Sequence, residues 1–154
     1  MEQIRFLAEQ FRAAIEQAKE NGETDPLGFF ERFPRGCCGY TSDLLGHFLL
    51  EKGIETDYIC GKCPAKNHWE NPQTHAWLLL DNETVIDITG DQFKDDDHFL
   101  RYNHSVYFGP IDDFHKLFIT DSISKRKSVF LNQLNLMEPH IFFDIYYKIK
   151  NCRR

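Results

Sequence analysis

Two short apolar runs separated by three polar residues constrain the fold of this chain more than any other feature. The runs cover residues 74–80 and 84–89, and Asp-Asn-Glu at 81–83 lies between them. Apolar runs that flank a turn-forming segment predict a β-hairpin. Each run contains one ionisable residue. His75 lies near the beginning of the first run, and Asp87 lies near the end of the second. An aspartate inside an apolar strand is costly to bury unless it is paired, and an imidazolium is the natural partner.

The segment before the hairpin combines backbone-breaking residues with two cysteines. Pro34 and Gly36 precede Cys37 and Cys38, and apolar residues then recur at helical spacing at 44, 45, 48 and 49. This pattern predicts a turn followed by an amphipathic helix. A helix N-terminus and a neighbouring imidazolium both lower the pKa of a thiol and so favour the reactive thiolate. The segment therefore predicts a nucleophilic cysteine where the helix begins.

A cysteine, a histidine and an aspartate thus follow in that order, and with Gly-x-Cys spacing this order resembles the papain-like cysteine superfamily, most closely its transglutaminase-like branch. The resemblance covers roughly the middle two fifths of the chain. It implies an α+β fold with helices packed on an antiparallel sheet, and covalent acyl transfer. Mapped residue by residue, the nucleophile falls on Cys38, the base on His75 and the orienting acid on Asp87. Arylamine N-acetyltransferases share this order, so the resemblance leaves the substrate open.

Alternatives remain for two members of this set. Cys37 competes for the nucleophile role, but Gly-x-Cys spacing and the adjacent helix favour Cys38, and we expect Cys37 to pack behind the turn. Asp91, just beyond the second apolar run, is the alternative acid. The family's oxyanion-hole glutamine, expected before the cysteine, has no counterpart, because residues 28–36 contain no Gln or Asn. The backbone N–H of Cys38 is then one oxyanion donor, and the second is open.

The length of the hairpin loop decides whether the two polar residues meet. A three-residue loop pairs Leu80 with Thr84, and His75 and Asp87 then lie on one face as diagonal neighbours. A two-residue loop would pair Leu78 with Asp87 and place the two side chains on opposite faces. The implied mechanism requires the first register, so we expect it.

The rest of the chain predicts one domain, residues 1–154, without repeats or a linker. Residues 63–73 are expected to form an exposed loop that rims the active-site cleft. Periodicity and breaker residues predict the remaining elements: helices at residues 4–18, 29–33, 129–136 and 141–149, and strands at residues 54–60 and 105–109.

A zinc module is an alternative interpretation. Cys60 and Cys63 form a Cys-x-x-Cys motif, and His68 and His75 follow at a spacing that zinc could use. One such motif is a weak signal, and a zinc ion at His75 would remove the proposed base. We therefore expect no metal and no cofactor. No role is assigned to the other histidines, at positions 47, 98, 104, 115 and 140.

Composition excludes several classes of function. Eighteen Lys and Arg against twenty-four Asp and Glu give a net charge of −6, which argues against nucleic acids and anionic membranes as partners. A hydrophobic content of 42% argues against disorder. The first residues lack the apolar core of a signal peptide, and the five cysteines are an odd number with two adjacent. We expect a cytoplasmic protein with reduced thiols.

These observations predict a cysteine-dependent acyl-transfer enzyme that acts on a protein, a peptide or a small amide. Hydrolysis, as in a cysteine peptidase or a deamidase, is favoured because the sequence marks no coenzyme A or amine site. An amine-acceptor transferase, of the transglutaminase or N-acetyltransferase type, is the first alternative. The second is a noncatalytic binding or regulatory domain that keeps the fold. The oligomeric state stays open.

Overall fold

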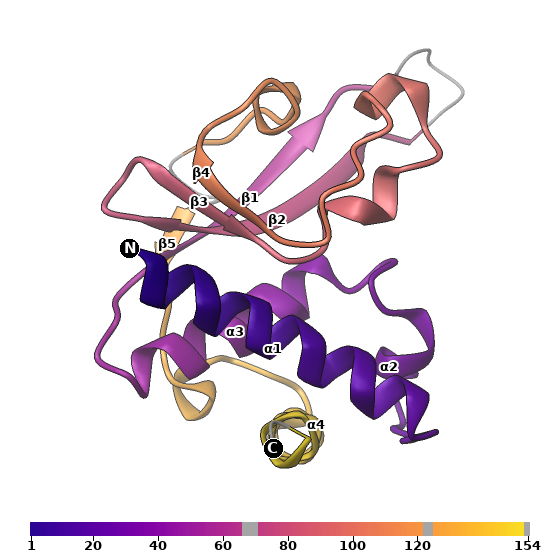
Figure 1. The fold of residues 1–154 in the computed structure, drawn as a ribbon, viewed down its shortest axis with the longest axis vertical. Helices are drawn as coiled ribbons and strands as arrows, with labels where there is room; N and C mark the ends of the chain where they lie inside the picture. Colours follow the sequence, from indigo (N-terminus) through magenta and orange to yellow (C-terminus); the bar gives the residue numbers. More distant parts are fainter. Residues whose placement is uncertain (66–70, 122–124, 153–154) are drawn as a thin grey trace.

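The structure is a computed structural model that describes residues 1–65, 71–121 and 125–152, and within them the fold is α+β (Figure 1). The helices are α1 (Glu2–Glu20), α2 (Phe29–Arg32), α3 (Cys38–Leu50) and α4 (Pro139–Asn151). The strands are β1 (Asp57–Cys63), β2 (Gln73–Leu80), β3 (Thr84–Asp87), β4 (Tyr107–Pro110) and β5 (Lys125–Lys127). Single 3₁₀ turns are η1 (Gly90–Phe93), η2 (Asp97–Phe99), η3 (His115–Leu117) and η4 (Leu131–Gln133).

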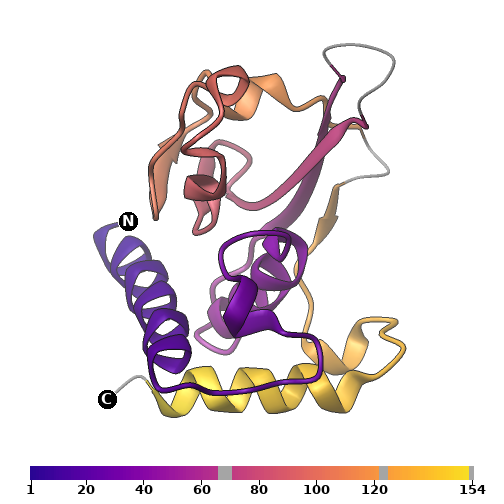
Figure 2. The same cartoon turned by 90° about the vertical axis from the view of Figure 1, so that its right-hand side faces the viewer.

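The five strands form one antiparallel sheet in the order β4-β3-β2-β1-β5. Its two faces are covered by different parts of the chain, as Figures 1 and 2 show. The helices cover one face, with α3 against the sheet and α1 and α4 outside it. The segment that carries η1, η2 and η3 covers the other face with an aromatic cluster. Because both faces are buried, β2 is apolar from Ala76 to Leu80 instead of alternating.

Successive residues of β2 contribute to opposite cores. Leu78 and Leu80 pack with the helices, around a stacked pair of rings from Phe11 and Phe48 whose centroids lie 5.3 Å apart. Trp77 and Leu79 instead face the aromatic cluster. This alternation follows from the pleat of the strand. It also places His75, which has the parity of Trp77, on the aromatic side of the sheet.

The N-terminal half confirms the helices expected there. The Asp25 carboxylate accepts hydrogen bonds from the backbone N–H groups of Leu27, Phe29 and Phe30, which fixes the start of α2. Gly36 has a φ of +67°, a left-handed conformation that glycine adopts without strain and that turns the chain into α3. The helix begins at Cys38, as the sequence predicts.

The predicted strand at 54–60 and loop at 63–73 need correction. The strand is displaced toward the C-terminus, so Cys63 is a buried strand residue opposite Gln73 and does not lie in a loop. It extends to Cys63 because residues 73 and 74 supply pairing partners for its end. Residues 66–70 of the predicted loop lie outside the described residues.

The prediction of a helix at residues 129–136 is wrong, whereas the last helix is confirmed and begins at Pro139. Hydrogen bonds to distant segments hold the backbone at the start of this stretch. Ser128 N–H donates to the Thr56 carbonyl at 2.8 Å, and Leu131 N–H donates to His47 Nδ1 at 3.1 Å. The chain therefore runs as the edge strand β5 and then as the single turn η4. None of the helices described above is long and apolar enough to cross a membrane.

Candidate active site

Cys38 lies against the first half of β2, where β3 no longer pairs with that strand. The pairing of β2 with β3 covers Leu78 to Leu80, whereas its pairing with β1 continues to Gln73. Ala76 therefore lies beyond the last pair with β3, and its backbone N–H hydrogen-bonds to the Cys38 sulfur. This contact holds the thiol at the N-terminus of α3 against the start of β2.

The hairpin has the predicted register. Leu80 pairs with Thr84, and Asp81 and Asn82 in the three-residue loop adopt positive φ angles of 52° and 63°. His75 and Asp87 consequently share a face, and His75 Nε2 lies 2.7 Å from Asp87 Oδ2. Their side chains are 0% and 1% exposed, respectively. The imidazole and the carboxylate thus form a buried hydrogen-bonded ion pair.

The charges of this site favour a thiolate and an imidazolium. Burial alone would lower the pKa of His75, but the charge and hydrogen bond of Asp87 and the contact with Cys38 raise it to about 9. Burial likewise opposes ionisation of Cys38, but the hydrogen bond and charge of His75 outweigh it, so the pKa of this thiol is lowered. The pKa of Asp87 lies well below its ordinary value, because His75 and His115 offset its burial.

Cys37 has the opposite environment. It is 1% exposed, belongs to the core between the helices and the sheet, and stands at the N-cap of α3. Burial raises the pKa of its thiol to about 11. A thiol of this kind is a small hydrophobe at neutral pH, so the two adjacent cysteines separate into one packing residue and one ionisable residue.

Asp91, the alternative acid, points away from His75. Its carboxylate makes two hydrogen bonds to the Arg12 guanidinium, each 2.9 Å long. Arg12 also donates to the Ile88 carbonyl at 2.7 Å. Asp91 therefore fastens α1 to the segment after β3, and the structure brings Asp87, not Asp91, to His75.

A second histidine joins the site from the other side of Asp87. His115 Nε2 lies 3.2 Å from Asp87 Oδ2, and His115 Nδ1 lies 2.6 Å from Asp112 Oδ1. Tyr102 donates its hydroxyl to the other oxygen of Asp112 at 2.8 Å. Sequence reasoning assigned His115 no role, because it lies 28 residues from Asp87 and no pattern links the two positions.

Gln92 was also missed. Its Nε2 lies 3.3 Å from His75 Nδ1, the ring nitrogen opposite the one that binds Asp87, and donates to the Thr89 carbonyl at 3.1 Å. The family's oxyanion-hole glutamine precedes the cysteine, whereas Gln92 follows the strand that carries the acid. The one sequence feature that could have indicated Gln92 is its position directly after Asp91, the alternative acid.

The turn after β3 encloses the Asp87 carboxylate. Thr89 donates its backbone N–H to Asp87 Oδ1 at 2.9 Å and its hydroxyl to the same oxygen at 3.3 Å. A Cβ atom at Gly90 would lie 2.9 Å from Asp87 Oδ2 and 2.6 Å from the Tyr102 ring. Only glycine allows the chain to pass this close, so the turn holds the carboxylate in one orientation.

The Cys-x-x-Cys motif does not converge on one point. Cys60 and Cys63 are three residues apart on β1, so their side chains lie on opposite faces of the sheet. Cys63 Sγ contacts His98 Nε2 at 3.4 Å, and His68 lies outside the described residues. The geometry gives no support to a zinc module centred on Cys60 and Cys63.

Within the described ranges, one group of three side chains, His75, Asp87 and His115, places possible metal ligands within 4.8 Å of one another. Two ligands that each lie 2.0 Å from a tetrahedral zinc are about 3.3 Å apart. The 2.7 Å between His75 and Asp87 is shorter than this and is a hydrogen-bond distance. We therefore interpret the group as linked by protons and assign it no metal.

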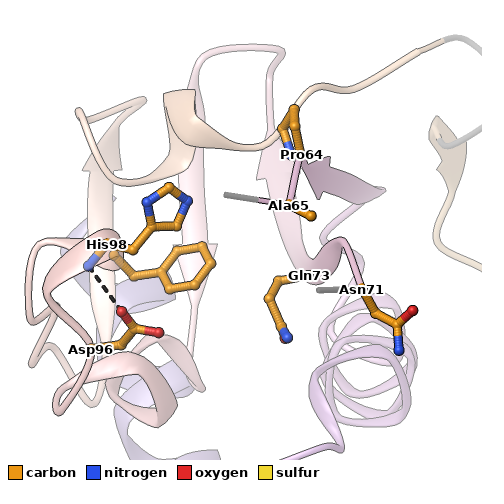
Figure 3. Close-up of a pocket in the computed structure, with 7 residues that line it drawn as sticks. Pro64, Ala65, Asn71, Gln73, Asp96 and His98 are labelled. Carbon is orange, nitrogen blue, oxygen red and sulfur yellow. Dashed lines mark hydrogen bonds between the residues drawn. The ribbon is translucent and has the colours of Figure 1, made fainter. Parts of the chain in front are cut away.

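A pocket of about 360 Å³ opens at the start of β2 (Figure 3). Gln73, Asn71 and His98 line it, and Gln73 is two residues before His75 on the same face of the strand. Figure 3 shows Gln73 on one side of the hollow and His98 on the other, where Asp96 accepts the backbone N–H of His98. The pocket is thus polar, and its Gln73 stands two residues from His75 on β2.

Comparison of the chain with family models, with curated proteins and with solved structures finds no match. What the site can do is therefore inferred from its chemistry.

Proposed function

We propose that this chain is a cysteine-dependent acyl-transfer enzyme with a papain-like, transglutaminase-like core, and that it hydrolyses amides in the cytoplasm. One observation carries the proposal: a thiol at a helix N-terminus contacts an imidazole whose far nitrogen lies 2.7 Å from a fully buried carboxylate. A buried ion pair is a poor source of stability, because desolvation offsets its attraction. Such a costly arrangement beside a thiol is what nucleophilic catalysis requires.

In the proposed reaction, Cys38 begins as a thiolate and His75 as an imidazolium that Asp87 orients. The thiolate attacks the carbonyl carbon of the amide and forms a carbon–sulfur bond. His75 then gives its proton to the departing amine, which leaves a thioester on Cys38. A water molecule attacks the thioester with His75 as the base, and the acid and the free thiol are released.

Two donors stabilise the oxyanion in this proposal. The backbone N–H of Cys38 at the start of α3 is the first. The side-chain amide of Gln92 is the second, because Gln92 Nε2 and the Cys38 thiol both lie against His75 and the Nε2 of that ring is occupied by Asp87. Gln92 thereby takes the place of the glutamine missing before Cys38.

The pocket at Gln73 is the proposed site for the substrate's side chain. Asn71, Gln73 and His98 present amide and imidazole groups, which suit a hydrogen-bonding group better than an aliphatic one. We therefore expect a peptide or a small amide with a polar group next to the scissile bond.

The proposal is tested by acylation with an activated ester such as p-nitrophenyl acetate. We expect the full chain to release p-nitrophenol in a burst and to carry one acetyl group, mapped to Cys38 by mass spectrometry. Cys37→Ser should retain the burst, whereas Cys38→Ala should lose it. If the wild-type protein is folded but none of its thiols is acylated, the result would favour a noncatalytic binding or regulatory domain. Faster loss of the acetyl group to an added amine than to water would favour a transferase.

Gln92→Ala separates acylation from alkylation. We expect the burst rate to fall by about 10²-fold, the cost of removing one oxyanion donor, because an ester forms a tetrahedral oxyanion. Alkylation of Cys38 by iodoacetamide forms no oxyanion, so its rate should change by less than about threefold. Equal losses in both rates would mean that Gln92 acts on the thiolate and not on the oxyanion. Asn135→Ala, at an amide that lines a different pocket beside α4, is the matched control.

A further inference from the structure

His115 lies between two carboxylates in a fully buried position. Its Nε2 lies 3.2 Å from Asp87 Oδ2 and its Nδ1 lies 2.6 Å from Asp112 Oδ1, and its side chain is 0% exposed. A carboxylate only accepts hydrogen bonds, and a neutral imidazole has one N–H to donate. Both contacts can be hydrogen bonds only when both ring nitrogens carry a proton.

We propose that His115 is held as an imidazolium between Asp87 and Asp112, and that this second cation acts through Asp87 to make His75 a better proton donor to the leaving group. His115 is thus a positioning residue, since it reaches His75 by way of the shared carboxylate oxygen. This inference rests on the proposed acyl transfer for its chemical purpose, but the charge of His115 can be measured without any substrate.

The groups around His115 fit a cation. Asp87 approaches from β3 and Asp112 from the loop before η3, while the rings of Tyr102 and Tyr107 lie 5.7 Å and 5.4 Å from it. Burial raises the pKa of both tyrosines, so they stay neutral. Burial would lower the pKa of His115, but its hydrogen bonds to Asp112 and Asp87 raise it. The charges then alternate along the network. Cys38, Asp87 and Asp112 are negative, and His75 and His115 between them are positive.

The positive charge of His115 reduces the amount by which Asp87 raises the pKa of His75. The centroids of the two imidazole rings are 6.3 Å apart. At an effective dielectric constant of 20, two unit charges at that separation repel by an amount equal to about two pKa units. Asp87 alone would hold the His75 proton too firmly for transfer to an amine. With His115 charged, His75 keeps its proton at neutral pH yet can still release it.

The test uses the full chain labelled with ¹⁵N in its histidines, observed by NMR as a function of pH. We expect both ring nitrogens of His115 to be protonated at pH 7.5. In His115→Gln, which keeps one donor toward Asp87 but no charge, the pKa of His75 should rise by about one to two units. Asp112→Asn should shift it in the same direction, because His115 then loses its proton. His104→Gln, which removes an exposed ring beside Tyr102, should leave it unchanged.

Three results would overturn the inference. The first is a single protonated nitrogen on His115 in the wild-type protein. The second is an unchanged or lower pKa of His75 in a folded His115→Gln variant. The third is a stoichiometric metal ion whose removal by a chelator changes the His75 and His115 signals. The wild-type spectrum decides the first point even where the variants fail to fold. Failure of Cys38 to form an acyl-enzyme, with His115 doubly protonated, would instead count against the proposed function.

Discussion

Cys38 is expected to react with iodoacetamide at pH 7 about 10-fold to 100-fold faster than any other thiol of the chain, because its contact with His75 lowers its pKa. Burial raises the pKa values of Cys37, Cys60 and Cys63, so these thiols should be slow. The measurement is a time course of alkylation of the native protein followed by peptide mapping of all five cysteines. Equal rates at the half-buried Cys38, Cys60 and Cys152, or a dominant Cys37, would contradict the assignment of Cys38.

His75→Ala should abolish most of this difference. The imidazolium is what lowers the pKa of Cys38 against its burial, so without it burial dominates and the thiol ionises only at alkaline pH.

The pH profiles of alkylation and acyl transfer should differ in the wild-type protein. The rate of alkylation should stay high at every pH above the lowered pKa of Cys38. Acyl transfer should instead decline as the pH rises past about 9, where His75 loses the proton that the leaving amine needs. His104→Ala, at an exposed histidine, is the control and should leave both profiles unchanged.

Asp87→Asn should reduce acylation of Cys38 by about 10²-fold to 10⁴-fold, as expected when an orienting acid becomes neutral. Asn cannot stabilise an imidazolium by charge, and a fully buried His75 then loses its proton below neutral pH. The pH dependence of alkylation should accordingly move to alkaline pH. Circular dichroism and chemical denaturation must show a folded variant for the comparison to hold.

Asp91→Asn is the matched control for Asp87→Asn, and its effect should be on stability. It breaks the two-bond pair with Arg12, whose side chain is 8% exposed, and should lower the free energy of unfolding by about 3 kcal/mol. The alkylation profile of Cys38 in the folded protein should be unchanged. A shifted thiol titration in Asp91→Asn with a normal one in Asp87→Asn would show that the acid has been misassigned. Glu16→Gln, which removes the exposed partner of Arg12, should cost less than about 1 kcal/mol.

The sequence by itself determined those parts of the site whose chemistry is local. The Gly-x-Cys turn and the helical spacing after it predict Cys38 at the start of α3, and the structure has it there. The two apolar runs predict the hairpin, and the chemistry expected of His75 and Asp87 selects the three-residue loop that the structure has. In both segments the period of the apolar residues and the turn residues between them indicate the same element, so neighbours in the chain suffice.

Only the tertiary structure decided which residues from distant segments complete the site. Asp91 is the alternative acid in the sequence, and the structure binds it to Arg12 on α1, 79 residues away, instead of to His75. His115 and Asp112 reach Asp87 through a loop without periodicity. The segment expected as a helix at 129–136 is likewise held by distant residues, because Ser128 and Leu131 donate their backbone N–H groups to Thr56 and His47. Hydrogen bonds and ion pairs between segments far apart in the chain leave no spacing pattern, so folding alone brings these groups together.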